Sequence, residues 1–298
     1  MITRFSNHAG ITPVACALPH FPFPIPHAMN FHTTLHNCPR KAHALTVIAA
    51  TALCCTTVCA QTPPDDQPSV TPYRPSVSTP AALSAPGWLE IEAGAQHARG
   101  SGSERRDSVP YTLKLAFTPD WGVRIGGDAW VRQTDEFGQS LRGGGDAGIV
   151  LKRRFAVNDT SAFGLEAGAT LPVGKPGIGS GKSDYSLNAI YSADMGDYHT
   201  DLNLASMRIG AVDAGVSRTQ TLWAASLSRS LDERWGIVGE FSGTQQSGLD
   251  STRQFLFAAS YNVTKALALD AGFARSIRSG VPDTSAFAGL TMLVGRLF

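Results

Sequence analysis

Cysteine, charge and long apolar runs are all scarce in this chain of 298 residues. The cysteines fall within the first sixty residues, at Cys16, Cys38, Cys54, Cys55 and Cys59, so the rest of the chain has neither a thiol nor a disulfide. Only 16% of the residues are charged and the formal net charge is +1, which leaves no basic excess for binding nucleic acid. Beyond residue 60 no apolar run reaches the roughly 18 residues of a membrane-spanning helix, so a helical anchor is excluded there.

The start of the chain has the organisation of a bacterial signal peptide. Residues 42–60 are mostly apolar, follow two basic residues and end in Val58-Cys59-Ala60, which suits cleavage after Ala60. We therefore expect residues 1–60 to be a signal peptide. A start at Met29 would make residues 1–28 an upstream extension.

Residues 61–87 are rich in proline, with seven prolines between positions 63 and 86. Proline has no amide donor for a β-ladder, and such a composition cannot bury a core. The segment is therefore predicted to be a disordered periplasmic linker. The alternative is a plug that threads the lumen of a barrel.

From Trp88 to Phe298 the pattern is of strands alone. Between residues 162 and 172, for example, Phe163, Leu165 and Leu171 alternate with small or polar residues at a period of two. A strand of about ten residues matches a tilted crossing of a bilayer, although a soluble β-sandwich also alternates. Twelve strands are predicted, at 88–98, 109–118, 122–132, 142–155, 162–172, 182–194, 198–210, 218–230, 235–246, 251–262, 265–276 and 284–298. The predicted fold is a single all-β, antiparallel transmembrane β-barrel over residues 88–298.

The connections and the aromatic residues favour the barrel over the sandwich. Short turns alternate with mostly longer loops, as in outer-membrane barrels. With an even number of strands, the first and the last strand of the barrel then have their chain termini on the same side, which is the short-turn, periplasmic side. The glycine runs at 143–145 and 179–181 are interpreted as bends next to strands. Aromatic residues gather at the short-turn ends as an interfacial girdle would, at Trp121, Phe155, Phe163, Tyr198, Trp235, Tyr261 and Phe298. The final Phe298 resembles the signal that the barrel-assembly machinery recognises, so we expect the outer membrane of a Gram-negative cell.

Three stretches carry a resemblance to a known family. They are DAGIVLKRRF at 146–155, FGLEAGATLPVG at 163–174 and GSGKSDY at 179–185. Together they resemble the bacterial outer-membrane transporter family of the putative phenol-degradation meta-pathway protein, and the similarity extends over most of residues 88–298. The resemblance implies an outer-membrane barrel for the uptake of hydrophobic or aromatic compounds. It assigns no substrate-binding residue.

The predicted function is passive uptake of small, hydrophobic or aromatic solutes, with outer-membrane lipid, the barrel-assembly machinery and the solute as partners. A structural barrel with a closed lumen is one alternative, and a lipid-modifying enzyme is another. A serine-dependent lipid hydrolase would need a histidine beside a serine at the outer rim, and only His97 and His199 lie beyond residue 60. No catalytic, cofactor-binding or metal-binding residue is predicted.

The candidate site is the barrel interior. Charged residues on the polar face of the predicted strands are expected to face the lumen, where they would either line a conduction path or pair across a filled interior. The candidates are Arg124, Asp128, Arg132, Lys152, Arg154, Glu166, Asp184, Glu240 and Asp270.

Overall fold

The computed structural model of the chain describes residues 67–100, 103–278 and 281–298. The predicted signal peptide and residues 61–66 lie outside the described residues, so the predictions made for them stay predictions. Within the described part, no helix is long and apolar enough to cross a membrane.

The strands of the described residues form one sheet in which every strand is antiparallel to its neighbours. Its strands are β1 (Trp88–Arg99), β2 (Arg105–Ala116), β3 (Trp121–Thr134), β4 (Ser140–Gly143), β5 (Ala147–Asn158), β6 (Ser161–Leu171), β7 (Tyr185–Met195), β8 (Tyr198–Arg208), β9 (Thr219–Ser230), β10 (Trp235–Gln246), β11 (Thr252–Thr264), β12 (Leu267–Arg278) and β13 (Val281–Arg296).

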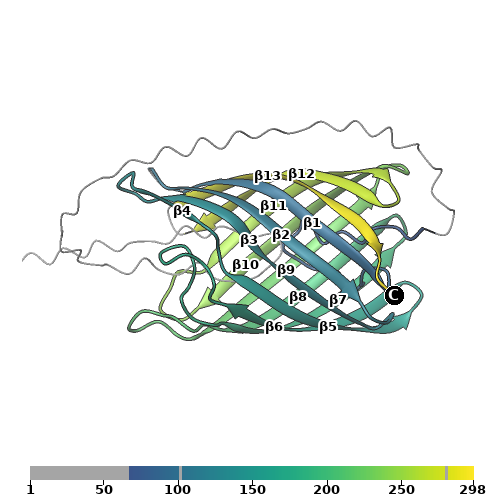
Figure 1. Cartoon of the computed structure of the whole chain (residues 1–298), viewed down its shortest axis with the longest axis horizontal. Coiled ribbons are helices and arrows are strands. Elements are labelled where there is room, and N and C mark those ends of the chain that lie inside the picture. Colours follow the sequence, from purple (N-terminus) through teal and green to yellow (C-terminus); the bar gives the residue numbers. More distant parts are fainter. Residues whose placement is uncertain (1–66, 101–102, 279–280) are drawn as a thin grey trace, which may run out of the picture. The chain divides into compact units, whose positions relative to one another are not determined.

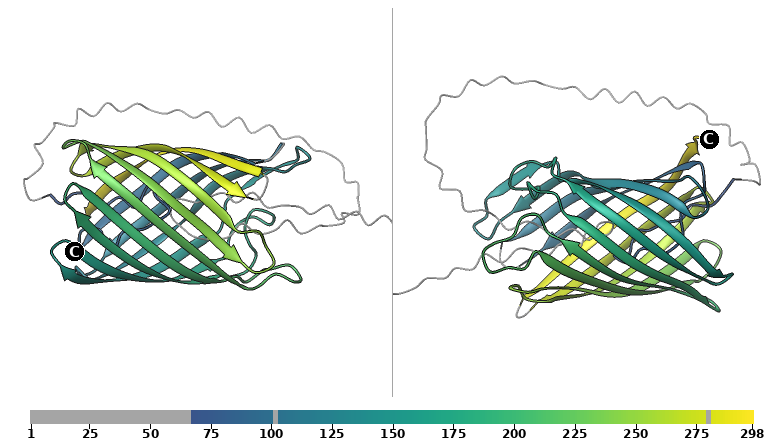
Figure 2. Two further views of the ribbon diagram at one scale, coloured as in Figure 1. Left: turned by 180° about the vertical axis from the view of Figure 1, so that it is seen from behind. Right: turned by 90° about the horizontal axis from the view of Figure 1, so that it is seen from below.

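The sheet closes on itself into a barrel. β1 pairs with β13 and with β2, and β2 pairs in turn with β3. β3 pairs with β5 along its first half and with the short β4 along its last four residues, so β4 and β5 together occupy one position in the wall. The prediction of a twelve-stranded antiparallel barrel is therefore confirmed. Figures 1 and 2 show the strands inclined to the barrel axis on every side of the wall.

The wall is apolar outside and polar inside. Leu204, Leu187 and Phe255 are 60%, 59% and 54% exposed, whereas Glu90 and Glu92 are 0% exposed. A soluble protein shows the opposite distribution, with leucine inside and glutamate outside. The sandwich alternative is thereby excluded, because the alternation of the sequence turns its apolar face away from the interior.

The wall departs from the predicted strands at β4 and β5, at the connection between β12 and β13, and at the start of β2, which begins at Arg105 and not at residue 109. The single strand predicted at 142–155 is divided between β4 and β5, and the glycine run at 143–145 lies at the break, as glycines that mark a bend would. The strands predicted at 265–276 and 284–298 left a connection at 277–283, but β12 continues to Arg278 and β13 begins at Val281. Pairing between these two strands includes Ile277 opposite Pro282.

The two ends of the barrel differ as predicted. Two-residue turns at 159–160, 196–197 and 265–266 lie at one end, together with the start of β1 and the end of β13. Trp88 is paired with Arg296 there, and the chain end is marked C in Figure 1. Longer connections at 172–184 and 209–218 lie at the opposite end.

Candidate functional site in the barrel lumen

Residues 68–86, here called the lumenal segment, lie inside the barrel. The amide of Tyr73 donates to Glu92 on β1 at 2.7 Å, and the amide of Ser78 donates to Glu240 on β10 at 2.8 Å. The amide of Ala81 donates to Ser192 Oγ on β7 at 2.7 Å. These partners are buried side chains on widely separated strands. A single stretch of chain can reach all of them only from within the lumen.

This part of the predicted linker is irregular, as its prolines require, but it has a defined path. The structure assigns it no strand, and its polar backbone groups bond instead to side chains of the wall. The expectation of a disordered linker over 61–87 rested on the inability of the segment to form a ladder or a core of its own. The lumen supplies the partners that the segment lacks, and no local sequence signal reveals them.

Arg74 enters a slot made of two glycines. Gly94 on β1 is paired with Gly289 on β13, and a methyl group built on either glycine would lie 2.7 Å or less from the Arg74 side chain. The guanidinium then makes two hydrogen bonds of 3.0 Å to Asp270 on β12. Both side chains are almost fully buried. The wall is therefore shaped and charged to receive this arginine.

Tyr73 sits among three cations of the wall, here called the tyrosine cage. Lys114 Nζ lies 4.0 Å from the ring centroid, Lys152 Nζ 4.3 Å and Arg124 Cζ 5.6 Å. Each is within the roughly 6 Å over which a cation is attracted to an aromatic face. The Tyr73 hydroxyl accepts a hydrogen bond from Lys152 at 3.1 Å and donates one to the carbonyl of Ala82 at 2.7 Å. The side chain is held at both its face and its polar tip.

Three glutamates balance the charge of the tyrosine cage. Lys114 Nζ lies 2.5 Å from a carboxylate oxygen of Glu90 and of Glu92. Glu166 on β6 faces Arg124 at 3.0 Å and Lys152 at 3.4 Å, and it also accepts a hydrogen bond from Asn188 at 3.1 Å. Pairing of this kind reduces the cost of placing charge away from bulk water. The cage lies in the half of the barrel next to the short turns.

The structure places seven of the nine predicted lumenal residues in buried positions. They are Arg124, Asp128, Lys152, Glu166, Asp184, Glu240 and Asp270, each at most 8% exposed. Glu166, Arg124 and Lys152 form one cluster, whereas Glu240 and Asp270 hold different parts of the lumenal segment. Asp128 instead pairs with Arg106 at 2.8 Å.

Asp184 lies in the connection before β7, where it accepts a hydrogen bond from the amide of Gly210 at 2.7 Å. Burial raises the pKa of its carboxyl, and the Gly210 amide opposes that rise. Asp184 therefore ties together two of the longer connections and takes no part in the tyrosine cage.

Arg132 and Arg154 differ from the other candidates. Arg132 is exposed, and its neighbour Val131 is fully buried. The cause is a β-bulge at Ala129, where β3 has one residue more than β2, so that the inward and outward positions of β3 are exchanged beyond it. Arg154 is half-buried on the same side of β5 as Lys152, close to the turn.

Several lumenal residues are not among the nine candidates. The alternation places Glu90, Glu92 and Lys114 on the polar face of their strands, so the parity that gave the other candidates also points these three inward. Arg106 lies upstream of the strand predicted to start at residue 109. Tyr73 and Arg74 carry no signal at all, because they belong to an irregular segment.

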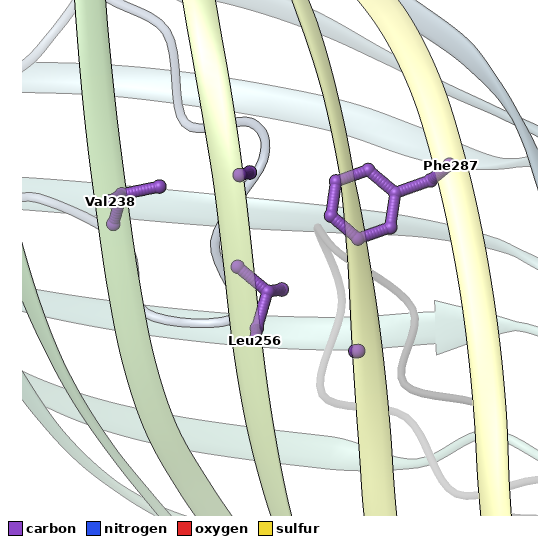
Figure 3. Packing of buried hydrophobic residues seen from close by; sticks show 5 residues of the cluster. Val238, Leu256 and Phe287 are labelled. Atoms are coloured by element: carbon purple, nitrogen blue, oxygen red, sulfur yellow. The ribbon is translucent and has the colours of Figure 1, made fainter.

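An apolar patch interrupts the polar wall. Val238, Leu256, Ala258, Ala274 and Phe287 form a buried cluster on β10 to β13. Figure 3 shows Val238 and Leu256 on the adjacent strands β10 and β11, and Phe287 on β13, with β12 between Leu256 and Phe287. A methyl group on Gly272 of β12 would lie 2.8 Å from Phe287 Cζ, so the phenylalanine ring lies close against the wall.

Both described histidines have carboxylate partners. His97 Nδ1 lies 2.5 Å from Asp107, and its Nε2 accepts a hydrogen bond from Arg99 at 3.0 Å. His199 has Asp194 at one ring nitrogen and Asp201 at the other. A serine hydrolase needs one ring nitrogen directed at the serine hydroxyl. These contacts do not favour the lipid-modifying enzyme.

Comparison with known proteins identifies the fold. No family model matches the chain, and no curated protein matches its sequence. Among solved structures, an outer-membrane channel from Pseudomonas putida F1 superposes with a TM-score of 0.55 at 14% identity, covering 72% of this chain and 97% of the other. The NanC porin superposes with a TM-score of 0.51 at 10% identity, covering 69% and 100% of the two chains. The fold is that of a Gram-negative outer-membrane barrel.

Proposed function

We propose that the protein is an outer-membrane channel through which small solutes enter by passive diffusion. The observation that carries the proposal is the inverted wall, with leucine and phenylalanine outside and charged side chains inside. The closed ladder satisfies the backbone without water, and the polar lumen suits a hydrated path. Outer-membrane lipid and the barrel-assembly machinery are the partners that this proposal implies.

The proposed solutes are small and hydrophobic or aromatic. Two observations support this class. The stretches at 163–174 and 179–185 resemble the transporter family of the putative phenol-degradation meta-pathway protein. The apolar patch on β10 to β13 makes part of the inward-facing wall apolar, which suits an apolar solute better than charged side chains would.

Swelling of liposomes that contain the purified protein tests the proposal. Uncharged aromatic solutes such as hydroquinone should enter faster than sugars or amino acids of similar size, because the apolar patch favours the ring. Entry of sugars and uncharged aromatic solutes at rates set by size alone would contradict the proposed solute class. Entry of none of them would contradict the channel itself.

A structural barrel with a closed lumen is the second candidate. The lumenal segment favours it, because the segment is bonded to several strands across the interior. The two candidates differ in whether the segment moves. Flux through the full-length chain supports the channel, whereas a barrel that conducts only after the segment has been displaced by mutation supports the closed lumen.

A further inference from the structure

The geometry points to the tyrosine cage as a binding site for a neutral phenolic ring, which Tyr73 occupies as a tethered competitor of the solute. The inference rests on the proposed function and narrows its solute class. It starts from the fact that the occupant of the cage is itself a phenol, carried by a segment that is not part of the barrel ladder.

The wall supplies recognition for each part of that ring. Lys114 and Lys152 lie 4.0 and 4.3 Å from the ring centroid, which suits the negative face of an aromatic system. Lys152 also donates to the hydroxyl oxygen at 3.1 Å. These groups belong to β2 and β5, so they remain in place if the lumenal segment leaves.

The charge of the cage selects a neutral ring over an anion. Lys114 is already paired with Glu90 and Glu92, and Glu166 faces both Arg124 and Lys152. Three cations and three carboxylates therefore balance before any ligand is counted. A benzoate would add an uncompensated charge to a buried site, whereas a phenol adds none.

The lumenal segment holds Tyr73 in the cage by contacts that a free phenol does not need. Lys114 donates to the Thr71 carbonyl at 2.6 Å, and Arg74 pairs with Asp270. Tyr73 and a free phenol compete for one position, so the apparent affinity for the phenol is lowered by the fraction of molecules in which the cage is occupied. Removing the Tyr73 ring should remove that competition.

Binding of 4-fluorophenol to the detergent-solubilised full-length protein, followed by ¹⁹F NMR, tests the inference. Tyr73→Ala should bind the probe about tenfold more tightly than the unmodified protein. Adding Lys152→Met to that variant should weaken binding about tenfold, because the hydroxyl loses a charged donor. Fluorobenzene and 4-fluorobenzoate should bind more weakly than 4-fluorophenol to Tyr73→Ala.

Tyr261→Ala is the matched control, since Tyr261 contacts Arg234 near a turn, far in the fold from the cage. Equal binding by Tyr73→Ala and Tyr261→Ala would overturn the inference, and so would fluorobenzene that binds as tightly as 4-fluorophenol.

If Tyr73→Ala is not recovered as a folded barrel, the Tyr73→Phe variant tests the inference in its place. Tyr73→Phe keeps the ring and loses only the hydroxyl contacts to Lys152 and Ala82. It should therefore bind the probe more tightly than the unmodified protein does. Equal binding by Tyr73→Phe and the unmodified protein would overturn the inference. The NMR experiment measures binding and not transport. Its result can therefore be interpreted even if no solute enters the liposomes in the test of the proposed function.

Discussion

At the scale of single residues, Glu166 is the lumenal carboxylate that pairs with two buried cations of the tyrosine cage. Its carboxylate faces Arg124 and Lys152 and accepts from Asn188. Glu166→Gln should destabilise the barrel by about 3 kcal/mol, because two buried cations lose their counter-ion. It should also shift the selectivity of the channel toward anions. Urea unfolding and the reversal potential in a salt gradient measure the two effects.

Glu233→Gln makes the same chemical change at an exposed turn position and should alter neither quantity. A Glu166→Gln protein that unfolds at the same urea concentration and has the same reversal potential would contradict the role assigned to Glu166.

The residue before Glu166 tests the opposite face of the same strand. Leu165 is 48% exposed and lies near the middle of β6, so it faces lipid at mid-depth. Leu165→Arg should cost about 2–4 kcal/mol in urea unfolding of the lipid-embedded protein. Leu231→Arg should cost much less, because Leu231 lies in the turn between β9 and β10, at the end of the barrel. Equal effects of the two substitutions would mean that the assignment of inside and outside is inverted.

At the scale of an element, the lumenal segment and the wall are matched in shape. Gly289 on β13 leaves room for Arg74, and a methyl group there would lie 2.6 Å from Arg74 Nε. Gly289→Val should therefore push Arg74 away from Asp270 and give a severalfold larger single-channel conductance. Gly295→Val is the matched control on the same strand, because an added methyl group there meets nothing within 4 Å. Unchanged conductance of Gly289→Val would show that the segment does not limit the path.

At the scale of the whole molecule, closure of the sheet removes the free edges on which an open sheet would aggregate or unravel. The β2–β3 pairing completes the ring, and the exposed leucine and phenylalanine side chains lie on its outer surface. The protein should therefore fractionate with the outer membrane and migrate on a detergent gel at a position that changes on heating. Release of the protein by osmotic shock would contradict the outer-membrane assignment.

Much of the fold could be predicted from the sequence because it depends on local periodicity. The alternation around Leu165 and Glu166 fixes which side chains lie on opposite faces, and prolines and glycines mark the ends of strands. The same reasoning correctly located most of the buried charges. It failed at Arg132, because the bulge at Ala129 exchanges the two faces and has no signature in the alternation of the neighbouring residues.

Local periodicity and turn residues therefore sufficed to predict twelve wall strands and, except beyond the bulge in β3, their two faces. Closure of the sheet between β2 and β3, the contacts of Glu166 with Arg124 and Lys152, and the path of residues 68–86 inside the lumen could be read only from the folded barrel. Periodicity is a property of residues two positions apart, and a strand displays it before it has any neighbour. The position of Tyr73 depends on side chains from distant strands, and these groups come within reach of one another only when the barrel is complete.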